Sequence, residues 1–129
     1  FKAINDQHGH AVGDQVLRLF ARTLQDQLHE GELLARMGGE EFVVMLPGLA
    51  PAQAKFIAER LRRSVQDLHV AQNDGRLRIT VSIGLDGYAA DEPAPNLDEV
   101  LARADHALYR AKAQGRNRVE QAEAQRQVI

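Results

Sequence analysis

The sequence predicts an α/β fold of the α+β kind, in which helices flank an antiparallel sheet. Segments whose apolar residues recur at helical spacing alternate along the chain with short apolar runs of strand length. Segments that contain glycine, asparagine or proline separate them and mark turns. The 129 residues are enough for one domain with a single core, and the chain shows no internal repeat.

Two helices are expected in the N-terminal part. Residues 1 to about 7 predict a short helix, which Gly9 interrupts. The apolar residues that follow recur at helical spacing and predict a long amphipathic helix with one buried stripe. These residues are Val12, Val16, Leu17, Phe20, Leu24 and Leu28.

A β-hairpin is expected next, with its turn at Gly38-Gly39. The pair lies between two apolar runs of strand composition, 33–37 and 42–46. Glycine takes the positive φ that tight hairpin turns require. Glu40 and Glu41 follow, and two carboxylates beside bare backbone suit Mg²⁺ and its phosphates. The simpler interpretation is a turn followed by two solvated glutamates.

A third helix and a strand are predicted in the middle of the chain. Pro51 suits the first turn of the helix. Its apolar positions are Phe56, Ile57, Leu61, Val65 and Leu68. Residues 73–75, Asn-Asp-Gly, predict a turn. Strict alternation of apolar with polar or glycine residues over 77–85 then predicts one strand with an apolar face. That face is Leu77, Ile79, Val81, Ile83 and Leu85.

The last predicted element is a helix between Asn96 and Gly115. Residues 91–96 contain two prolines and predict a loop. Asn96 can cap the helix, with Glu99 in the reciprocal position. The expected buried face is Leu97, Val100, Leu101, Ala104 and Leu108. From Glu120 onward the chain is polar, and we expect a frayed helix or a disordered tail.

Composition and charge exclude several classes of function. The chain has no cysteine, so it forms neither a disulfide framework nor a thiolate metal site, which is compatible with a reducing cytosol. A net charge of −2 gives no general attraction to nucleic acid or to an anionic membrane. The sequence has no apolar run of membrane-spanning length and no signal-peptide pattern. It begins at Phe1, inside a motif, so we expect a piece of a longer protein. We expect this part to be cytoplasmic even if the parent protein is tethered to a membrane.

Three segments together resemble a known family. They are residues 1–14 (FKAINDQHGHAVGD), 38–42 (GGEEF) and 109–117 (YRAKAQGRN). In order and spacing they resemble the GGDEF family of diguanylate cyclases, in the variant with Glu at the third motif position. The resemblance implies a GGDEF domain over residues 1–119, with a ferredoxin-like core related to the palm of nucleotide cyclases and polymerases, and a polar tail over 120–129.

The resemblance also implies that the domain is N-terminally truncated. In the family, a strand before Phe1 is central to the sheet and carries a metal-binding aspartate. Either the chain tolerates this loss, or the exposed sheet edge finds another partner. Hard cations depend on oxygen ligands, so the loss of this aspartate should weaken binding of the divalent cation. We therefore expect the chain to bind guanine nucleotide and to cyclise it poorly. A longer form that restores the strand should recover activity.

The implied reaction joins two GTP molecules into cyclic di-GMP and releases two pyrophosphates. Two divalent cations, Mg²⁺ or Mn²⁺, help to deprotonate a ribose 3′-hydroxyl and stabilise charge on the phosphates. By resemblance, Glu40 is a metal ligand that accepts or relays this proton, and Glu41 is a second carboxylate near the cations. Gly38 and Gly39 let the backbone approach the nucleotide. Each domain binds one GTP, so turnover requires a homodimer.

The first segment has its own implied roles. Lys2 resembles a catalytic family lysine that contacts phosphate and stabilises charge in the transition state, although a lone lysine is usually solvated. Asn5 and Asp14 match the family's guanine readers, because a carboxylate accepts from guanine N1–H and N2–H while an amide offers a donor and an acceptor. Their local alternatives are a helix cap for Asn5 and a first-turn residue for Asp14. His10 is expected to be a structural or ribose-side contact, and His8 an exposed helix-end residue.

The third segment implies phosphate contacts. Lys112 and Arg116 lie four positions apart at the end of the last helix. In the family this pair contacts the terminal phosphates of GTP. A helix C-terminus also favours cations for purely local reasons. Arg36 and Arg103 receive no role beyond strand and helix charge.

Tight inhibitory binding of the product is not expected at residues 29–32. Many family members carry an inhibitory Arg-x-x-Asp site for cyclic di-GMP, whereas residues 29–32 here read His-Glu-Gly-Glu. Histidine lacks the planar fork of arginine, and glutamate merely lengthens the acid. If cyclic di-GMP binds, we expect it in the active half-site, where Asn5 and Asp14 hold one base.

Two other functions stay open. One is a non-catalytic domain that binds GTP or cyclic di-GMP and regulates a neighbour, although the intact catalytic and guanine-reading positions argue against it. The other is an RNA-recognition module, which would stack bases on strand aromatics. The predicted strands offer only Phe42 and Tyr88 and no basic surplus. We therefore expect no nucleic-acid partner and no membrane contact by this domain.

Overall fold

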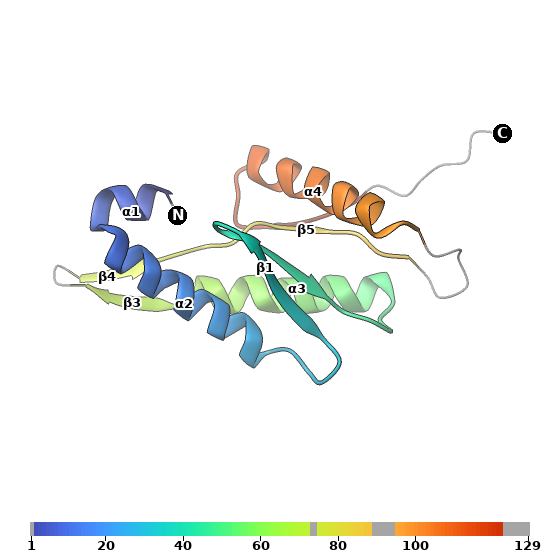
Figure 1. Cartoon of the computed structure of the whole chain (residues 1–129), viewed down its shortest axis with the longest axis horizontal. Helices are drawn as coiled ribbons and strands as arrows, with labels where there is room; N and C mark the ends of the chain where they lie inside the picture. Colours follow the sequence, from blue (N-terminus) through green and yellow to red (C-terminus); the bar gives the residue numbers. More distant parts are fainter. Residues whose placement is uncertain (1, 73–74, 89–94, 123–129) are drawn as a thin grey trace. The chain divides into compact units, whose positions relative to one another are not determined.

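Helices and strands alternate along the chain, as the sequence predicts (Figure 1). The structure is a computed structural model that describes residues 2–72, 75–88 and 95–122. The described strands pair into three two-stranded sheets, of which two are antiparallel and one is parallel. The α+β class with antiparallel pairing is therefore confirmed, and the parallel pair is an addition to it.

Contacts between the elements divide the chain into two units. The first contains Phe1–Pro47 and Asp67–Arg78, and the second contains Gly48–Gln66 and Ile79–Ile129. Each unit has its own helices and its own paired strands. The predicted site residues consequently fall into two groups, one in each unit.

The first unit opens with two helices, α1 (Lys2–His8) and α2 (His10–Asp26), which meet at Gly9. Gly9 has φ +88°, a conformation that glycine adopts without strain. The predicted apolar stripe of α2 is confirmed at its centre. Its buried apolar residues are Val16, Phe20 and Leu24. Leu28, expected to extend the stripe, lies beyond the helix end.

Two antiparallel strand pairs belong to the same unit. The predicted hairpin consists of β1 (Leu33–Gly38) and β2 (Glu41–Met45). The second pair, β3 (His69–Gln72) and β4 (Gly75–Arg78), contains one strand that the sequence did not predict, β3. Residues 73 and 74 of the predicted turn lie outside the described residues.

The second unit begins with α3 (Pro51–Gln66), and Pro51 is its first residue, as predicted. The residues of α3 that are buried are Ala58, Leu61 and Val65. Phe56, expected on the buried face, is 71% exposed because it lies off the stripe that these three residues define. Leu68, also expected there, lies beyond the helix end.

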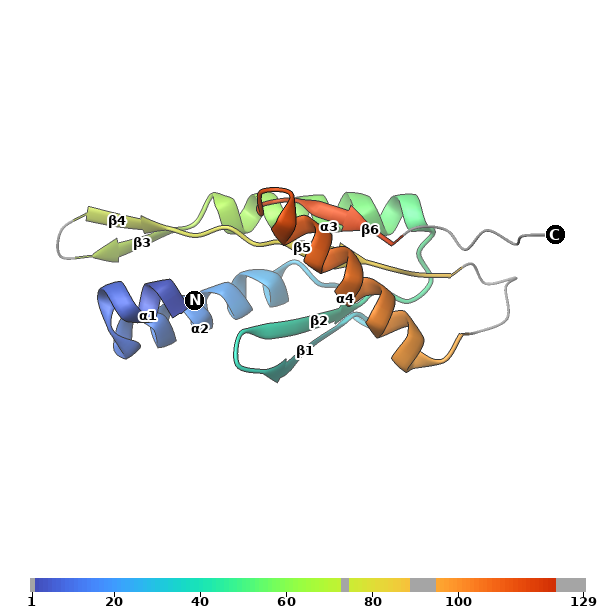
Figure 2. The ribbon, with the colours of Figure 1, turned by 90° about the horizontal axis from the view of Figure 1, so that it is seen from above.

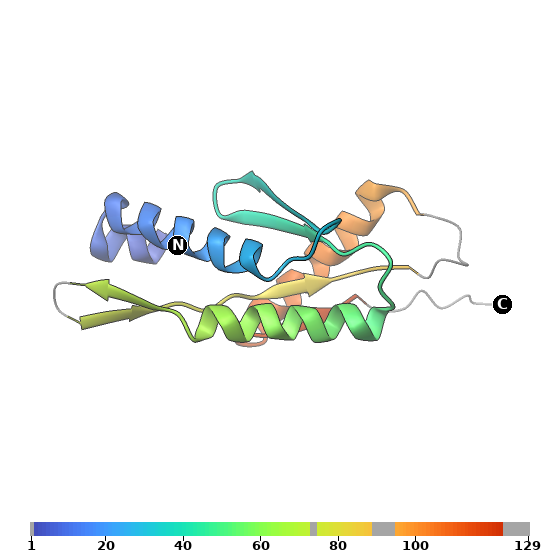
Figure 3. The same ribbon diagram turned by 90° about the horizontal axis from the view of Figure 1, so that it is seen from below.

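A small parallel sheet forms the centre of the second unit. β5 (Ile83–Leu85) pairs with β6 (Val119–Gln121), and both strands contact α3 and α4 (Leu97–Ala113). Figures 1 and 2 show the two helices on opposite faces of this pair, and Figure 3 shows α3 alongside β5.

Two expectations about these strands are wrong. The single strand predicted over 77–85 is divided, because β4 pairs with β3 while β5 pairs with β6. Residues Glu120 and Gln121 are part of β6 rather than of a frayed helix or disordered tail. Residues 123–129 lie outside the described part of the chain.

Small residues let α4 lie close against β5. Ala107 and Ala111 are fully buried. At Gly84 of β5, a Cβ would collide with the carbonyl oxygen of Ala104 and the backbone of Leu108. Only glycine fits at this contact, and the sequence pattern had marked Gly84 merely as an alternate position of a strand.

The ends of α4 follow local chemistry. Asn96 is the N-cap, and its side-chain oxygen accepts a 2.7 Å hydrogen bond from the backbone N–H of Asp98. Leu97, expected on the buried face, is 57% exposed at the first helical position. Residues 91–94 of the predicted loop lie outside the described residues. None of the helices that the structure describes is long and apolar enough to cross a membrane.

Candidate active site

The tip of the hairpin, which we name the GGEE turn (residues 38–41), displays two carboxylates. Its two turn residues are Gly39 and Glu40, one position later than expected, because Gly38 still pairs with Glu41. Gly38 and Gly39 have φ of +147° and +53°, which side chains rarely adopt. Glycine at the first of two turn residues is typical of a type II′ hairpin. Glu40 and Glu41 are both exposed.

Arg36 ties the GGEE turn to its own strand. Its Nε–H donates a 2.8 Å hydrogen bond to the carbonyl oxygen of Gly39. The strand register shifts between Arg36 and Gly38, so a bulge lies next to the turn and the arginine spans it. The sequence assigned Arg36 no role. A long donor side chain just before a glycine pair is the signal that could have indicated one.

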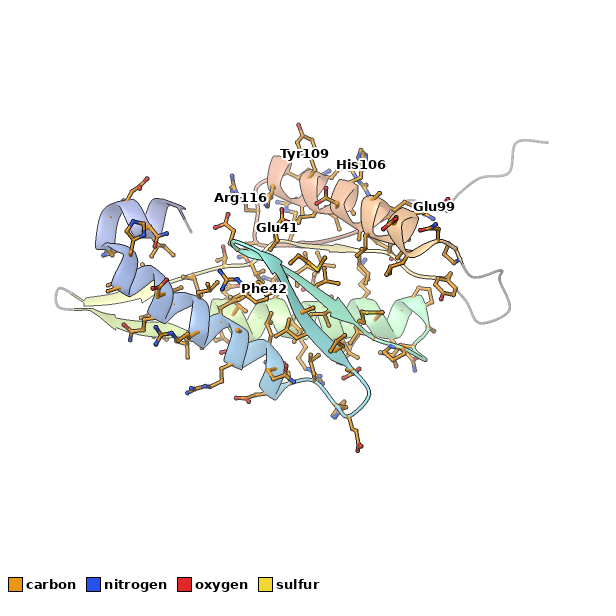
Figure 4. All side chains as sticks on the ribbon, viewed as in Figure 1. Glu41, Phe42, Glu99, His106, Tyr109 and Arg116 are labelled. Carbon is orange, nitrogen blue, oxygen red and sulfur yellow. The ribbon has the colours of Figure 1, made fainter. Side chains whose placement is uncertain are left out.

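An aromatic contact anchors the hairpin on α2. The rings of Phe20 and Phe42 lie 5.2 Å apart between centroids at an angle of 59°, within the range of favourable tilted pairs. Successive residues of a strand point to opposite faces. Packing of Phe42 against Phe20 therefore directs the neighbouring Glu41 away from this contact, at the tip of the hairpin (Figure 4).

The side chain of Asn5 on α1 lies against Gly13 of α2, the residue that precedes Asp14. The side-chain oxygen of Asn5 occupies the place that a Cβ at position 13 would take, so any other residue there would force the Asn5 side chain to shift. The N–H of Gly13 donates to the carbonyl of Gly9 at 3.1 Å, and that of Gly9 to the carbonyl of Asn5 at 2.9 Å. Sequence reasoning missed Gly13, although a glycine inside a helical pattern often indicates close packing.

The local explanations for these residues are wrong. Asn5 lies inside α1 and does not cap it, and α2 has no acidic residue in its first turn, so Asp14 lies beyond that turn. Asp14 is exposed and Asn5 half-buried. His10 is the exposed first residue of α2, whereas His8 is half-buried rather than exposed. Lys2 is the first residue of α1.

In the second unit, α4 ends in a Schellman motif that leads to Arg116. The N–H of Arg116 donates to the carbonyl of Ala111 at 2.9 Å, and that of Gly115 donates to the carbonyl of Lys112 at 3.5 Å. Gly115 has φ +120° and ends the helix as predicted. Lys112, in the last turn, and Arg116, just after the helix, are both exposed.

The segment that corresponds to the family's inhibitory site closes on itself. The N–H of His29 donates a 2.6 Å hydrogen bond to Oε1 of Glu32, and the N–H of Glu32 donates to the carbonyl of His29 at 3.0 Å. The carboxylate of Glu32 is thus used to stabilise its own turn.

The donors of the GGEE turn fit a hard cation. Within residues 2–72, 75–88 and 95–122, no three His, Cys, Asp or Glu side chains gather as a metal site. Mg²⁺, however, is commonly held by one or two carboxylates together with the phosphates of a substrate, rather than by a complete protein cage. Glu40 and Glu41 supply a donor set of that kind.

Comparison with known proteins identifies the family that the chain matches. The family model "Diguanylate cyclase, GGDEF domain" matches residues 1–118. The chain is 46% identical over 119 residues to the diguanylate cyclase DgcM of Escherichia coli strain K12, which covers 92% of this chain and 28% of DgcM. The chain therefore spans less than a third of that relative's length.

Solved structures resemble the fold closely. The GGDEF domain of DgcB from Caulobacter crescentus, in complex with c-di-GMP, is 35% identical with a TM-score of 0.87, covering 95% of this chain and 72% of that one. The active GGEEF domain of a diguanylate cyclase from Vibrio cholerae is 29% identical with a TM-score of 0.79, covering 96% of this chain and 77% of that one.

Proposed function

Because this chain belongs to the GGDEF domain family of diguanylate cyclases, we propose that it takes part in converting two GTP molecules into cyclic di-GMP and two pyrophosphates. One observation carries the proposal. The GGEE turn exposes Glu40 and Glu41 on a hairpin whose conformation is fixed by two glycines with positive φ and by the hydrogen bond from Arg36. A turn of this kind holds the backbone that carries the two carboxylates in one conformation and keeps the carboxylates accessible to a large ligand.

Glu40 and Glu41 hold a divalent cation in this proposal, as the divalent-metal dependence of the family requires, and we infer Mg²⁺ or Mn²⁺. When bound, the cation stabilises the negative charge of the phosphates. Glu40 accepts or relays the proton of the ribose 3′-hydroxyl. The bare backbone at Gly38 and Gly39 gives the nucleotide room to approach, since no atom lies within 4 Å of where their Cβ atoms would be.

The base and the phosphates are assigned to different elements. Asn5 and Asp14 read the guanine, and the side chain of Asn5 lies against Gly13, the residue before Asp14. Lys2 contacts phosphate and His10 lies on the ribose side. Each domain binds one GTP, so turnover requires a homodimer. Lys112 and Arg116 contact the terminal phosphates.

Product analysis tests the proposal. The chain is incubated with GTP and Mg²⁺, and cyclic di-GMP is quantified by chromatography. We expect guanine-nucleotide binding with slow turnover, and faster turnover by a longer form of the chain that includes residues before Phe1. In that longer form Glu40→Gln should lower turnover by about 10²–10⁴-fold, while Glu30→Gln, an exposed glutamate outside the turn, should not.

Two outcomes would contradict the proposal, one at the role of Glu40 and one at the cyclase activity itself. Turnover that survives Glu40→Gln would remove Glu40 from the chemistry. Binding of GTP without any product, in both the short and the longer form, would favour the regulatory alternative.

A further inference from the structure

The turn that follows α4 holds two residues in an uncommon backbone conformation. We name residues 115–117 the exit turn. Arg116 and Asn117 have φ of +63° and +47°, and they are the only described non-glycine residues with positive φ. Such conformations are strained and persist only where surrounding contacts hold them. The contacts that hold the exit turn are therefore informative.

Asn117 is held from α3. The guanidinium Nη1 of Arg62 donates to Oδ1 of Asn117 at 2.9 Å and to Oε1 of Gln66 at 2.8 Å. Nδ2 of Asn117 donates to the same Gln66 oxygen at 3.4 Å. The three side chains form a closed set of hydrogen bonds. Since the side chain of Arg62 is only 15% exposed and its Nε also pairs with Glu59 at 3.1 Å, these bonds are shielded from water.

Arg116 is held through its backbone on both sides. Its N–H donates to the carbonyl of Ala111, within the helix cap, at 2.9 Å. Its carbonyl oxygen accepts a 3.3 Å hydrogen bond from Nε of Arg118. The side chain of Arg116, in contrast, is exposed (Figure 4). The fold thus fixes the base of this side chain and leaves its charged end available.

We propose that Arg62 and Asn117 are positioning residues for Arg116, which hold the exit turn in its left-handed conformation and so orient the guanidinium toward the terminal phosphates of GTP. The inference rests on the phosphate role given to Arg116 under the proposed function. A guanidinium binds phosphate through a planar fork of donors, so its orientation matters as well as its charge. A turn free to relax would keep the charge and lose the orientation.

The ratio of GTP affinity to GMP affinity tests whether Arg62 and Asn117 position Arg116. Both nucleotides share the base and the α-phosphate, so the ratio reports contacts to the terminal phosphates. By calorimetry with Mg²⁺, Arg116→Ala should lower the ratio by roughly tenfold or more. Arg62→Ala and Asn117→Gly should each lower it by about three- to tenfold, with GMP affinity unchanged.

The variants separate positioning from folding. Glycine accepts a φ of +47° without strain, so Asn117→Gly removes the side-chain contacts while the turn stays available. Asn117→Asp keeps an oxygen that accepts from Arg62 and should restore most of the ratio. Arg63→Ala changes the exposed neighbour of Arg62 on α3 and should leave the ratio unchanged. Circular dichroism melting identifies any variant that unfolds. If Arg62→Ala unfolds, the affinity ratio of Asn117→Gly alone tests the positioning role.

Two results overturn the inference in different ways. If Arg116→Ala lowers the ratio but Arg62→Ala and Asn117→Gly do not, the positioning role is wrong while the phosphate role of Arg116 stands. If Arg116→Ala leaves the ratio unchanged, the phosphate role itself fails, and the positioning inference fails with it.

Discussion

The GGEE turn and the exit turn both present charged side chains, yet they are built in opposite ways. In the GGEE turn the positive φ angles fall on Gly38 and Gly39, and the charged residues follow them. In the exit turn the charged residue, Arg116, itself has positive φ. The first turn is encoded by neighbouring residues. The second depends on a hydrogen bond between side chains 55 positions apart in the sequence.

The difference matches what each turn is proposed to bind. Carboxylates that meet a cation and a phosphate chain need bare backbone around them, which glycine provides. A long arginine that must meet a phosphate needs a fixed starting direction, which packing of the exit turn provides. Under the proposed function, base recognition is assigned to residues of the first unit and terminal-phosphate contacts to residues of the second.

The largest expected effect tests this division. Asp14→Ala should weaken GTP binding by about 1.5–3 kcal/mol, roughly ten- to a hundredfold, because it removes a charge-assisted hydrogen bond. Only guanine offers the N1–H and N2–H groups from which the Asp14 carboxylate is proposed to accept. ATP binding should change far less. Arg116→Ala is the matched control and should weaken GTP and ATP alike, since both carry the same triphosphate. Calorimetric titration measures all four affinities, and equal losses for both nucleotides in Asp14→Ala would show that Asp14 is only structural.

A second prediction concerns the backbone of the two turns. Gly39→Ala should lower the free energy of unfolding by about 1–2 kcal/mol, because φ there is +53° and this left-handed conformation is strained for alanine. No neighbouring atom lies within 4 Å of the new Cβ, so packing adds nothing to the effect. Asn117→Gly should change stability little, because relief of backbone strain offsets the lost hydrogen bonds. Urea denaturation measures both. A larger loss in Asn117→Gly than in Gly39→Ala would reverse our comparison of the turns.

A smaller effect is expected from the one side chain that braces the GGEE turn. Arg36→Ala removes the hydrogen bond to the Gly39 carbonyl and should cost about 0.5–1 kcal/mol of unfolding free energy, a modest value because the site is exposed. Arg18→Ala, an exposed arginine on α2, is the control and should be neutral. If Arg36→Ala is also neutral, the glycines alone define the turn.

Features with local causes were predictable from the sequence. The break at Gly9, the start of α3 at Pro51, the cap at Asn96 and the helix end at Gly115 each follow from the conformation or hydrogen bonding of one residue. The candidate carboxylates of the GGEE turn were predictable for the same reason. The two glycines encode the turn locally, while the contact between Phe42 and Phe20 packs the hairpin on α2.

Features that depend on distant partners were not predictable. β3 and β6 are four and three residues long, too short for a periodic pattern, and β6 becomes a strand only by pairing with β5. Arg62 and Asn117 resemble ordinary polar residues until α3 and the exit turn meet. Gly13 and Gly84 likewise mark close approaches that only the folded chain contains.

The smallest expected effect concerns feedback by the product, and it contrasts Asp14 with Glu32, two acidic residues of the first unit. We propose that cyclic di-GMP binds in the active half-site, where Asn5 and Asp14 hold one guanine, rather than at residues 29–32. The carboxylate of Glu32 already accepts a 2.6 Å hydrogen bond from the N–H of His29, so it would have to leave its own turn to reach a ligand. Glu32→Ala should therefore leave cyclic di-GMP affinity almost unchanged, whereas Asp14→Ala should impair it. Calorimetric titration of both variants decides between the sites, and the reverse pattern would place the product at residues 29–32.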